Sequence, residues 1–309
     1  MDIRIENLTK KYASQKAVDA ISFEVKTGEI LGFLGPNGAG KTTTMKIITG
    51  YIAAAEGNIL IGGKAIRQYG DELKKHIGYL PEHNPLYHEM PVMDYLEFVG
   101  AIQGIAKTKV KERVREMIRV CGLNPEKHKK IGELSKGFRQ RVGLAQAMIH
   151  DPAILILDEP TTGLDPNQII EIRKLIRELG KEKTVILSTH ILPEVEATCD
   201  RILIINKGKI VADGTPETLR KQSEGREMLK VRIEDGDSNE IFSSLQALPT
   251  VGLVDFFDRG HNRFEIQSRP ELSSKREIFK LCVQKGWTLT EMSPLETKLE
   301  DIFRQLTTN

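Results

Sequence analysis

The sequence is poor in cysteine and in long apolar runs, and each shortage excludes a class of protein. Only three cysteines occur in 309 residues, Cys121, Cys199 and Cys282, and their odd number and wide spacing fit neither a disulfide framework nor a CxxC metal pair. They are expected to be reduced and buried. No window, including the start MDIRIENLTKKY, reaches the roughly 18 apolar residues that a membrane-spanning helix needs. The chain is therefore expected in the cytosol, with any membrane role coming through a partner.

Neither sign of charge dominates. The chain has 45 basic and 43 acidic residues and a formal net charge of +2, whereas strong binding to a nucleic-acid backbone needs a clear basic excess. No nucleic-acid partner is expected, and the basic stretch over residues 107–119 is interpreted as the solvated face of a helix. The 39 % of hydrophobic and 28 % of charged residues are typical of an ordinary folded protein, and the length allows about two domains.

Short apolar runs alternate with helical patterns over the first two thirds of the chain. ILGFL, AILILD and TVILST have the length of buried strands, and the stretches after residue 41 and over residues 167–180 have helical spacing. This pattern predicts an α/β domain with a buried parallel sheet. Apolar residues spaced three and four apart over residues 93–120 predict two or more amphipathic helices. The domain is expected to span residues 1–219.

A change of pattern after Thr218 predicts a second, smaller domain over residues 228–309. Residues 220–227 are polar and linker-like, and the order from Met228 onward is strand, helix, strand, strand, helix, strand. This order is that of an α+β ferredoxin-like module. An extra amphipathic helix is expected over residues 295–306, and Trp287 is expected in the core of the module.

A glycine-rich motif follows the apolar strand ILGFL and precedes a helix. The stretch GPNGAGKT fits G-x-x-x-x-G-K-[ST] in the strand-to-helix setting that a phosphate-binding loop requires. Its glycines let successive N–H groups turn around phosphates at the helix N-terminus, with Lys41 on the β- and γ-phosphates and the Thr42 hydroxyl on Mg²⁺. An ordinary glycine-rich turn is the alternative. The predicted ATP-binding residues of this loop are Gly35, Pro36, Asn37, Gly38, Ala39, Gly40, Lys41, Thr42 and Thr43.

Two adjacent carboxylates, Asp158 and Glu159, end the apolar strand AILILD. Adjacent residues of a strand face opposite ways, so the two are expected to have different roles. Asp158 is the candidate for holding Mg²⁺ through water, and Glu159 for polarising an attacking water molecule. A strand end with solvated acids is the alternative.

The segments around these motifs resemble the ATP-binding cassette (ABC) family of ATPases. LSKGFRQR over residues 134–141 lies where that family has its LSGGQ signature, TGLDP over residues 162–166 resembles the D-loop, and His190 the switch histidine. Tyr12 in KKYASQKAV resembles the aromatic residue that stacks on adenine. The resemblance covers roughly residues 1–218 and implies a P-loop NTPase cassette, with a RecA-like α/β lobe and a helical lobe at about residues 94–136. Taken alone, either His190 or Tyr12 could instead be an ordinary surface residue, and this is the alternative interpretation.

The resemblance also implies a mechanism shared by two subunits. Two cassettes would pair head to tail, as a homodimer or with a close paralogue, so that Ser135 and the backbone of Gly137 meet the γ-phosphate in the partner's P-loop. Asp165 would link the two sites, and His190 would contact the γ-phosphate in the ATP site of its own chain. The predicted catalytic residues are Glu159, His190 and Lys41. A separate transmembrane permease is expected to hold the chain on the cytoplasmic face of the inner membrane.

The sequence departs from the family pattern at two places. Glu82 stands where the family usually has the Q-loop glutamine, and its carboxylate is expected to act as a metal ligand beside Thr42 and Asp158. In the signature, Lys136 replaces a glycine and Phe138 a glutamine. Lys136 is expected either to add a cation toward the nucleotide or to face solvent.

LPEHNPLY, LSKGFRQRVGLAQA and EPTTGLDPNQ, with the added C-terminal module, resemble the ATPase subunits of bacterial exporters of the DrrA type. The resemblance is greatest to the gliding-motility-associated ABC transporter ATP-binding subunit. It implies an exporter in which the surface after residue 82 receives a helix of the membrane subunit. That surface is expected to include Pro85, Leu86, Tyr87 and Met90, and burial of these residues in the chain's own core is the alternative.

The second hypothesis for the function is a soluble ABC-type mechanochemical ATPase that acts on nucleic acid or ribosomes. The interval from Lys41 to Ser135 holds no sustained heptads, the chain has a single P-loop, and its charge is balanced. A GTPase or small-molecule kinase is a third class, but the sequence has no guanine-reading NKxD. These features favour the transporter subunit.

Overall fold

The structure is a computed structural model that describes residues 1–223, 227–270, 272–294 and 299–307. Its contacts divide the chain into two compact units, Met1–Pro216 together with the chain's end from Leu306, and Glu217–Gln305. The expected domains, residues 1–219 and 228–309, differ from these units chiefly in where the chain's end belongs. Within the described residues no helix is both long enough and apolar enough to cross a membrane.

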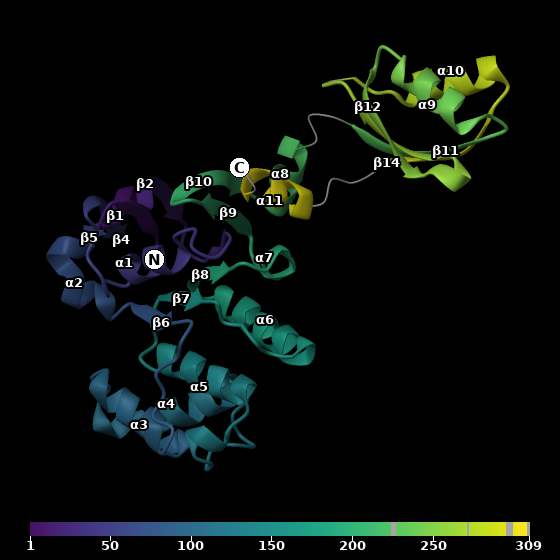
Figure 1. Cartoon of the computed structure of the whole chain (residues 1–309). Helices are drawn as coiled ribbons and strands as arrows, with labels where there is room; N and C mark the ends of the chain where they lie inside the picture. The colour runs from purple at the N-terminus through teal and green to yellow at the C-terminus, as the bar shows by residue number, and fades with distance from the viewer. Residues whose placement is uncertain (224–226, 271, 295–298, 308–309) are drawn as a thin grey trace. The chain divides into compact units, whose positions relative to one another are not determined.

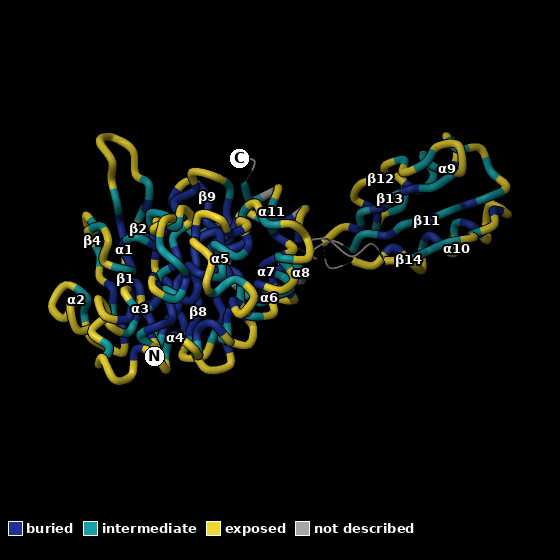
Figure 2. Tube along the Cα trace, turned by 90° about the horizontal axis from the view of Figure 1, so that it is seen from below, coloured by how far each residue is buried: buried dark blue, intermediate teal, exposed yellow. Residues whose placement is uncertain are grey.

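A six-stranded sheet with the order β10-β9-β3-β8-β7-β6 forms the centre of the first unit (Figure 1). All neighbouring strands are parallel except β10, which pairs antiparallel with β9. Every residue of β3, β7 and β8 is buried, as the dark blue tube at β8 in Figure 2 illustrates, and this burial explains why most of their residues are apolar. The predicted α/β class is confirmed. The strands are β3 (Ile30–Leu34), β6 (Ile77–Leu80), β7 (Ile154–Asp158), β8 (Thr184–Thr189), β9 (Arg201–Asn206) and β10 (Lys209–Gly214).

An antiparallel sheet with the order β2-β1-β4-β5 packs against this centre. Its strands are β1 (Ile3–Tyr12), β2 (Gln15–Val25), β4 (Glu56–Ile61) and β5 (Lys64–Ala65). One apolar cluster joins both sheets and helix α1 (Lys41–Ile48), and in it the rings of Phe23 on β2 and Phe33 on β3 lie 5.6 Å apart. The strand that leads into the glycine-rich loop is therefore fixed from several sides.

The helices α3 (Val92–Ile102), α4 (Lys107–Val120) and α5 (Lys136–Met148) form a separate group in the first unit (Figure 1). Arg113 of α4 donates hydrogen bonds to the carbonyls of Met148 and Ile149 at 3.1 and 3.0 Å, and the Tyr95 hydroxyl of α3 bonds Gln146 of α5. The amphipathic helices predicted over residues 93–120 are confirmed as α3 and α4. The group also includes α5, so it reaches beyond the residues 94–136 expected for a helical lobe. The remaining helices of this unit are α2 (Ile66–Lys74), the short 3₁₀ turn Ile131–Glu133, α6 (Pro166–Gly180) and α7 (Leu192–Thr198).

The second unit has the predicted ferredoxin-like module. Its strands have the order β12-β13-β11-β14 and all pair antiparallel, which is the arrangement of a strand-helix-strand-strand-helix-strand chain. Trp287 is 9 % exposed in its core, as expected. Its elements are β11 (Met228–Glu234), α9 (Ser238–Gln246), β12 (Val251–Asp258), the 3₁₀ turn Arg259–His261, β13 (Arg263–Ser268), α10 (Lys275–Lys285) and β14 (Thr288–Pro294).

Two segments that flank this module differ from expectation. Residues 220–223, read as part of a linker, belong to helix α8 (Pro216–Ser223), whereas residues 224–226 lie outside the described residues. The helix expected over residues 295–306 corresponds to α11 (Leu299–Thr307), and residues 295–298 lie outside the described residues. The polar composition of residues 220–223 does not exclude a helix, because arginine, lysine and glutamine have high helix propensity.

The three cysteines are free and buried, as predicted. Burial raises the pKa of the Cys121 thiol to about 12. Because the thiolate is the reactive form of cysteine, Cys121 is inert at neutral pH.

Candidate active site

The glycine-rich loop runs from β3 into α1 and closes around its own lysine. Gly40 has φ +110°, and a Cβ at this position would lie 2.4 Å from the carbonyl oxygen of Ala17. Only glycine fits such a conformation at such an approach. The ammonium of Lys41, which is 6 % exposed, donates hydrogen bonds to the carbonyls of Gly35 at 2.8 Å and Pro36 at 3.2 Å. The lysine is thus held by two carbonyls of its own loop.

A pocket of about 380 Å³ opens in front of this loop. It brings together residues of the loop with four other stretches, the start of β2, the turn after β6, the turn after β7 and the residue that follows β8. The lining residues are Ala17, Asn37, Gly38, Gly40, Lys41, Thr42, Thr43, Glu82, Glu159, Thr162 and His190. Most of the residues predicted from the P-loop, Walker B, Q-loop and switch patterns therefore share one cavity.

Glu159 stands at the centre of the polar contacts in this pocket. Its carboxylate lies 3.6 Å from the ammonium of Lys41 and 2.9 Å from Nδ1 of His190, and it accepts a hydrogen bond from the Thr162 hydroxyl at 3.2 Å. Its backbone has φ 51°, a left-handed conformation that is uncommon for a residue other than glycine. Glu159 directly follows the last residue of β7, and this backbone conformation directs its carboxylate into the pocket.

Asp158 lies beneath Glu159 and is fully buried. Its Oδ1 accepts a hydrogen bond of 2.5 Å from the Ser188 hydroxyl, and its Oδ2 has no hydrogen-bond partner. Burial raises the pKa of this carboxyl, against the lowering effect of the Ser188 and Thr42 hydroxyls, and the charges of Glu159 and Glu82 raise it further. A buried carboxylate oxygen without a partner, close to a hydroxyl and to two more carboxylates, fits a divalent cation that prefers oxygen ligands.

Eight predicted residues do not line this pocket. Four of them belong to its immediate surroundings, Gly35, Pro36 and Ala39 of the loop and Asp158 next to Glu159, and the other four are Tyr12, Ser135, Gly137 and Asp165. Tyr12, at the end of β1, is 51 % exposed and has the ammonium of Lys10 5.5 Å from its ring centroid. Ser135 is the N-cap of α5, where its hydroxyl accepts a hydrogen bond from the N–H of Phe138, and Asp165 is the N-cap of α6. Gly137 is buried in the first turn of α5. A single chain therefore brings its P-loop and Glu159 together with Thr162, the first residue of the D-loop segment, but leaves Ser135, Gly137 and Asp165 apart from them.

Sequence reasoning missed three residues of the site. Ala17 reaches the pocket because the start of β2 packs on the loop at Gly40, a long-range contact with no local pattern. Thr162 and Ser188 orient Glu159 and Asp158. The hydroxyl residues next to the carboxylates in EPTTG and next to the histidine in ILSTH were the available signal.

The surface expected to receive a partner helix is only partly exposed. Leu86 is buried in the chain's own core, as the alternative interpretation held, and is not available. Tyr87 is 55 % exposed, and its ring lies 5.7 Å from that of Phe98 and 5.9 Å from that of Tyr95. Ile102, one turn after Phe98 on α3, is 67 % exposed. An apolar surface formed by Tyr87, Phe98 and Ile102 therefore covers this side of α3.

The parallel sheet, the loop between β3 and α1 and the carboxylates at the end of β7 define a P-loop ATPase. A family model described as ABC transporter matches residues 18–162, and a model described as an AAA domain, putative AbiEii toxin of a type IV TA system, matches residues 130–195. Together with the relatives below, this shows that the chain belongs to the ATP-binding subunits of ABC transporters, whose activity is ATP hydrolysis.

Relatives of nearly equal length support this assignment. An uncharacterised ABC transporter ATP-binding protein, YxlF of Bacillus subtilis (strain 168), is 34 % identical over 97 % of this chain and 98 % of its own. The bacitracin transport ATP-binding protein BcrA of Bacillus licheniformis is 36 % identical, and the match covers 98 % of this chain and 96 % of BcrA. The Nod factor export ATP-binding protein I of Rhizobium sp. (strain N33) is 33 % identical, and the match covers 99 % of this chain and 96 % of that protein.

Solved structures agree with the fold of the first unit. CbiO1 of Clostridium perfringens, part of the ABC transporter complex cbiONQ, is 30 % identical with a TM-score of 0.66, and the match covers 72 % of this chain and 91 % of that one. The predicted P-loop NTPase cassette is thus confirmed as the fold of the first unit.

Proposed function

We propose that this chain is the ATPase of an exporter, which binds Mg-ATP in the pocket of its P-loop and hydrolyses it as one half of a head-to-tail pair. The observation that carries the proposal is the contact of Glu159 with both Lys41 and His190 at the wall of that pocket. A carboxylate in this place accepts a proton from a water molecule that approaches the γ-phosphate. Lys41 then neutralises charge on the phosphates, and His190 orients Glu159.

The residues present fit a magnesium ion. Thr42 and the unpartnered Oδ2 of Asp158 would hold it, with Glu82 on the exposed side of the pocket. When bound, Mg²⁺ neutralises the negative charge of the β- and γ-phosphates. Asp158 must then be ionised, and the ion favours that form against the burial that raises its pKa.

The proposal assigns the residues outside the pocket to the second copy's site. Ser135 and Gly137 lie at the N-terminus of α5, where free N–H groups favour an anion. Asp165 lies at the start of α6. A second copy of this chain, or a close paralogue, would place Ser135 and Gly137 on the γ-phosphate. Asp165 would link the two sites, and Tyr12 would stack on the adenine.

Export requires a separate permease, and the apolar surface of Tyr87, Phe98 and Ile102 is the proposed place for a helix of it. Exposed apolar side chains that adjoin one another are typical of interaction sites. BcrA and the Nod factor export protein, named for transport and export, support this choice over an ATPase that acts on nucleic acid or ribosomes. The chain would then lie on the cytoplasmic face of the membrane that holds the permease. A role in gliding motility stays a prediction from the sequence alone.

The solution mass of Glu159→Gln protein, with and without Mg-ATP, tests the proposed pairing. The variant is expected to bind ATP without completing hydrolysis and therefore to shift from monomer to dimer only with the nucleotide. The same measurement on Lys41→Ala, which removes the cation that faces the phosphates, is the control and should give monomer throughout. A Glu159→Gln protein that binds ATP and remains monomeric would contradict the shared site.

Replacing Glu82 by glutamine is expected to keep the ATPase rate within tenfold of the parent. Glutamine keeps an oxygen ligand at the pocket wall and removes a negative charge that faces Asp158. Glu82→Ala, which removes the ligand as well, is the matched comparison and should lower the rate more. Near-total loss of activity in Glu82→Gln would show that the carboxylate itself takes part in the reaction.

A further inference from the structure

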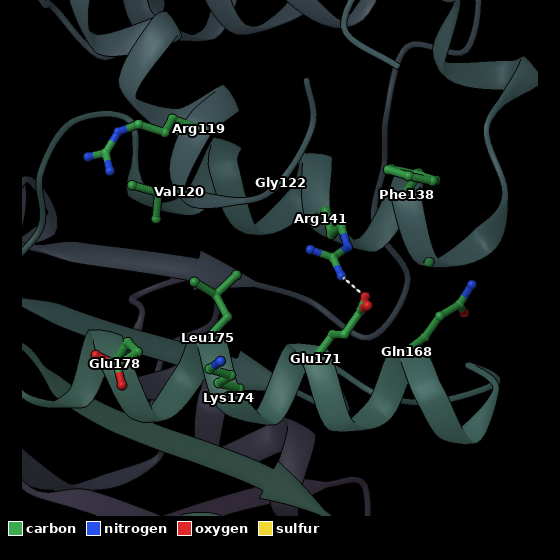
Figure 3. A pocket seen from close by; sticks show the side chains of 11 residues that line it. Arg119, Val120, Gly122, Phe138, Arg141, Gln168, Glu171, Lys174, Leu175 and Glu178 are labelled. Carbon is green, nitrogen blue, oxygen red and sulfur yellow. Dashed lines mark hydrogen bonds and ion pairs between the residues drawn. The ribbon is translucent and has the colours of Figure 1, made fainter. Parts of the chain in front are cut away.

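A second cleft, of about 500 Å³, lies away from the ATP pocket, between α5, the end of α4 and one face of α6 (Figure 3). Gln168, Glu171, Leu175 and Glu178 line it from α6 at intervals of three and four residues, which places them on one side of that helix. The opposite wall includes Gly137 and Arg141 of α5. The cleft therefore separates the helix that begins with the signature from the helix that begins with the D-loop.

An ion pair crosses this cleft. The guanidinium of Arg141 points at the carboxylate of Glu171 and bonds it, as the dashed line in Figure 3 shows. Arg141 also donates a hydrogen bond of 3.0 Å to the carbonyl of Cys121 at the end of α4. The Arg141 side chain is 15 % exposed. One arginine thus joins three helices, two of the helical group and one of the α/β part.

A second contact lies one turn closer to the two helix starts. A Cβ on Gly137 would lie 2.6 Å from the amide carbon of Gln168, so the Gln168 side chain occupies the space that a side chain at position 137 would need. Gln168 forms a capping box with Asp165: its N–H donates to the Asp165 carboxylate at 3.0 Å, and its Oε1 accepts from the Asp165 N–H at 3.4 Å. The signature and the D-loop are therefore linked through one amide side chain.

Lys136 adds a third contact between the same two turns. Its ammonium lies 2.0 Å from where a Cβ on Gly163 would be. Gly163 belongs to the D-loop segment and has φ +72°. The lysine that replaces the usual signature glycine thus extends along the D-loop of its own chain, and it does not line the ATP pocket.

We propose that Arg141, Glu171 and Gln168 form a latch that fixes the signature turn to the D-loop turn within one chain, so that the partner copy meets both as one preset surface. All three are positioning residues, since none of them lines the ATP pocket. The inference rests on the proposed function, because the two turns act on the partner's ATP. A site built from two helices needs their starts held within about 0.5 Å, and side chains locked by their neighbours supply that precision.

Glu171→Ala in the Glu159→Gln background tests the latch. The dissociation constant of the ATP-dependent dimer is expected to rise about fivefold, the scale that a partly exposed ion pair supports, while ATP binding to the single subunit is unchanged. Arg141→Ala should weaken the dimer more, since it also removes the bond to Cys121. The double variant should be no weaker than Arg141→Ala alone, because the two side chains act together. Glu171→Gln, which keeps a hydrogen-bond acceptor, should restore part of the loss.

Glu178→Ala is the matched control. Glu178 lies on the same face of α6, but it pairs with Lys181 of its own segment at 2.7 Å, so its loss should leave dimer formation unchanged. Equal dimer formation by the parent and Glu171→Ala, or an equal loss in Glu178→Ala, overturns the latch alone. A Glu159→Gln parent that stays monomeric with ATP bound overturns the shared site itself, and the latch with it.

Discussion

Glu159→Gln should lower the rate of ATP hydrolysis by about a hundredfold to ten-thousandfold, the range that a positioned general base contributes. The carboxylate is held by Lys41 and His190 at the wall of the ATP pocket, and the φ of 51° at this residue aims it there. Glutamine has nearly the same shape but does not accept a proton. This loss of rate corresponds to a rise of about 3–5 kcal/mol in the activation free energy of hydrolysis.

The measurement is the steady-state release of phosphate at saturating Mg-ATP, together with nucleotide affinity measured separately. Affinity should stay close to that of the parent, because the P-loop contacts remain. Glu194→Gln is a suitable control, since Glu194 is a buried glutamate that bonds the hydroxyls of Thr161 and Thr189 and does not line the pocket. A Glu159→Gln protein that keeps more than a tenth of the rate would remove Glu159 from the proposed role.

Phe33→Ala should lower the free energy of unfolding of the first unit by about 3–5 kcal/mol, as truncation of a fully buried phenylalanine does. Phe33 is 0 % exposed on β3, between β8 and β9, and its ring contacts Phe23 of the antiparallel sheet. The substitution therefore leaves a cavity where the two sheets meet, directly before the P-loop.

Urea unfolding followed by circular dichroism measures this loss. The fluorescence of Trp287, the only tryptophan, reports the second unit and should show an unchanged transition. Phe98→Ala is the exposed counterpart in the first unit and should cost about 1 kcal/mol or less. A loss below that value for Phe33→Ala would mean that the sheets repack around the missing ring.

The strands and motifs that the sequence predicts well are those with a local cause. The apolar runs of β3, β7 and β8 were enough to predict buried strands, and the P-loop was predicted from the spacing of its glycines and lysine. The antiparallel sheet, in contrast, depends on pairing between β1 and β4, which lie some fifty residues apart. Such pairing leaves no periodic trace in either strand.

The features of the site likewise divide into those that a local sequence pattern predicts and those that depend on contacts between distant segments. Asp158 and Glu159 were recognised by their place at a strand end, but nothing local to their segment indicated that Lys41 would contact Glu159 or that Asp158 Oδ2 would be unpartnered. The role of Lys136 was left open between nucleotide and solvent; the residue is exposed, and its ammonium lies beside Gly163, which its own segment did not indicate. Contacts between side chains from distant segments are set by tertiary packing, which the sequence pattern alone does not encode.

The return of the chain's end to the first unit has a further consequence. The Asn206 amide of β9 donates a hydrogen bond of 3.0 Å to the carbonyl of Leu306, so the second unit is an insertion tethered at both ends and not a tail. Each doubling of the length of a closed loop costs only about 0.6 kcal/mol. The cassette can therefore exchange this module for a larger or smaller one at little thermodynamic cost, provided that the last turn still reaches Asn206.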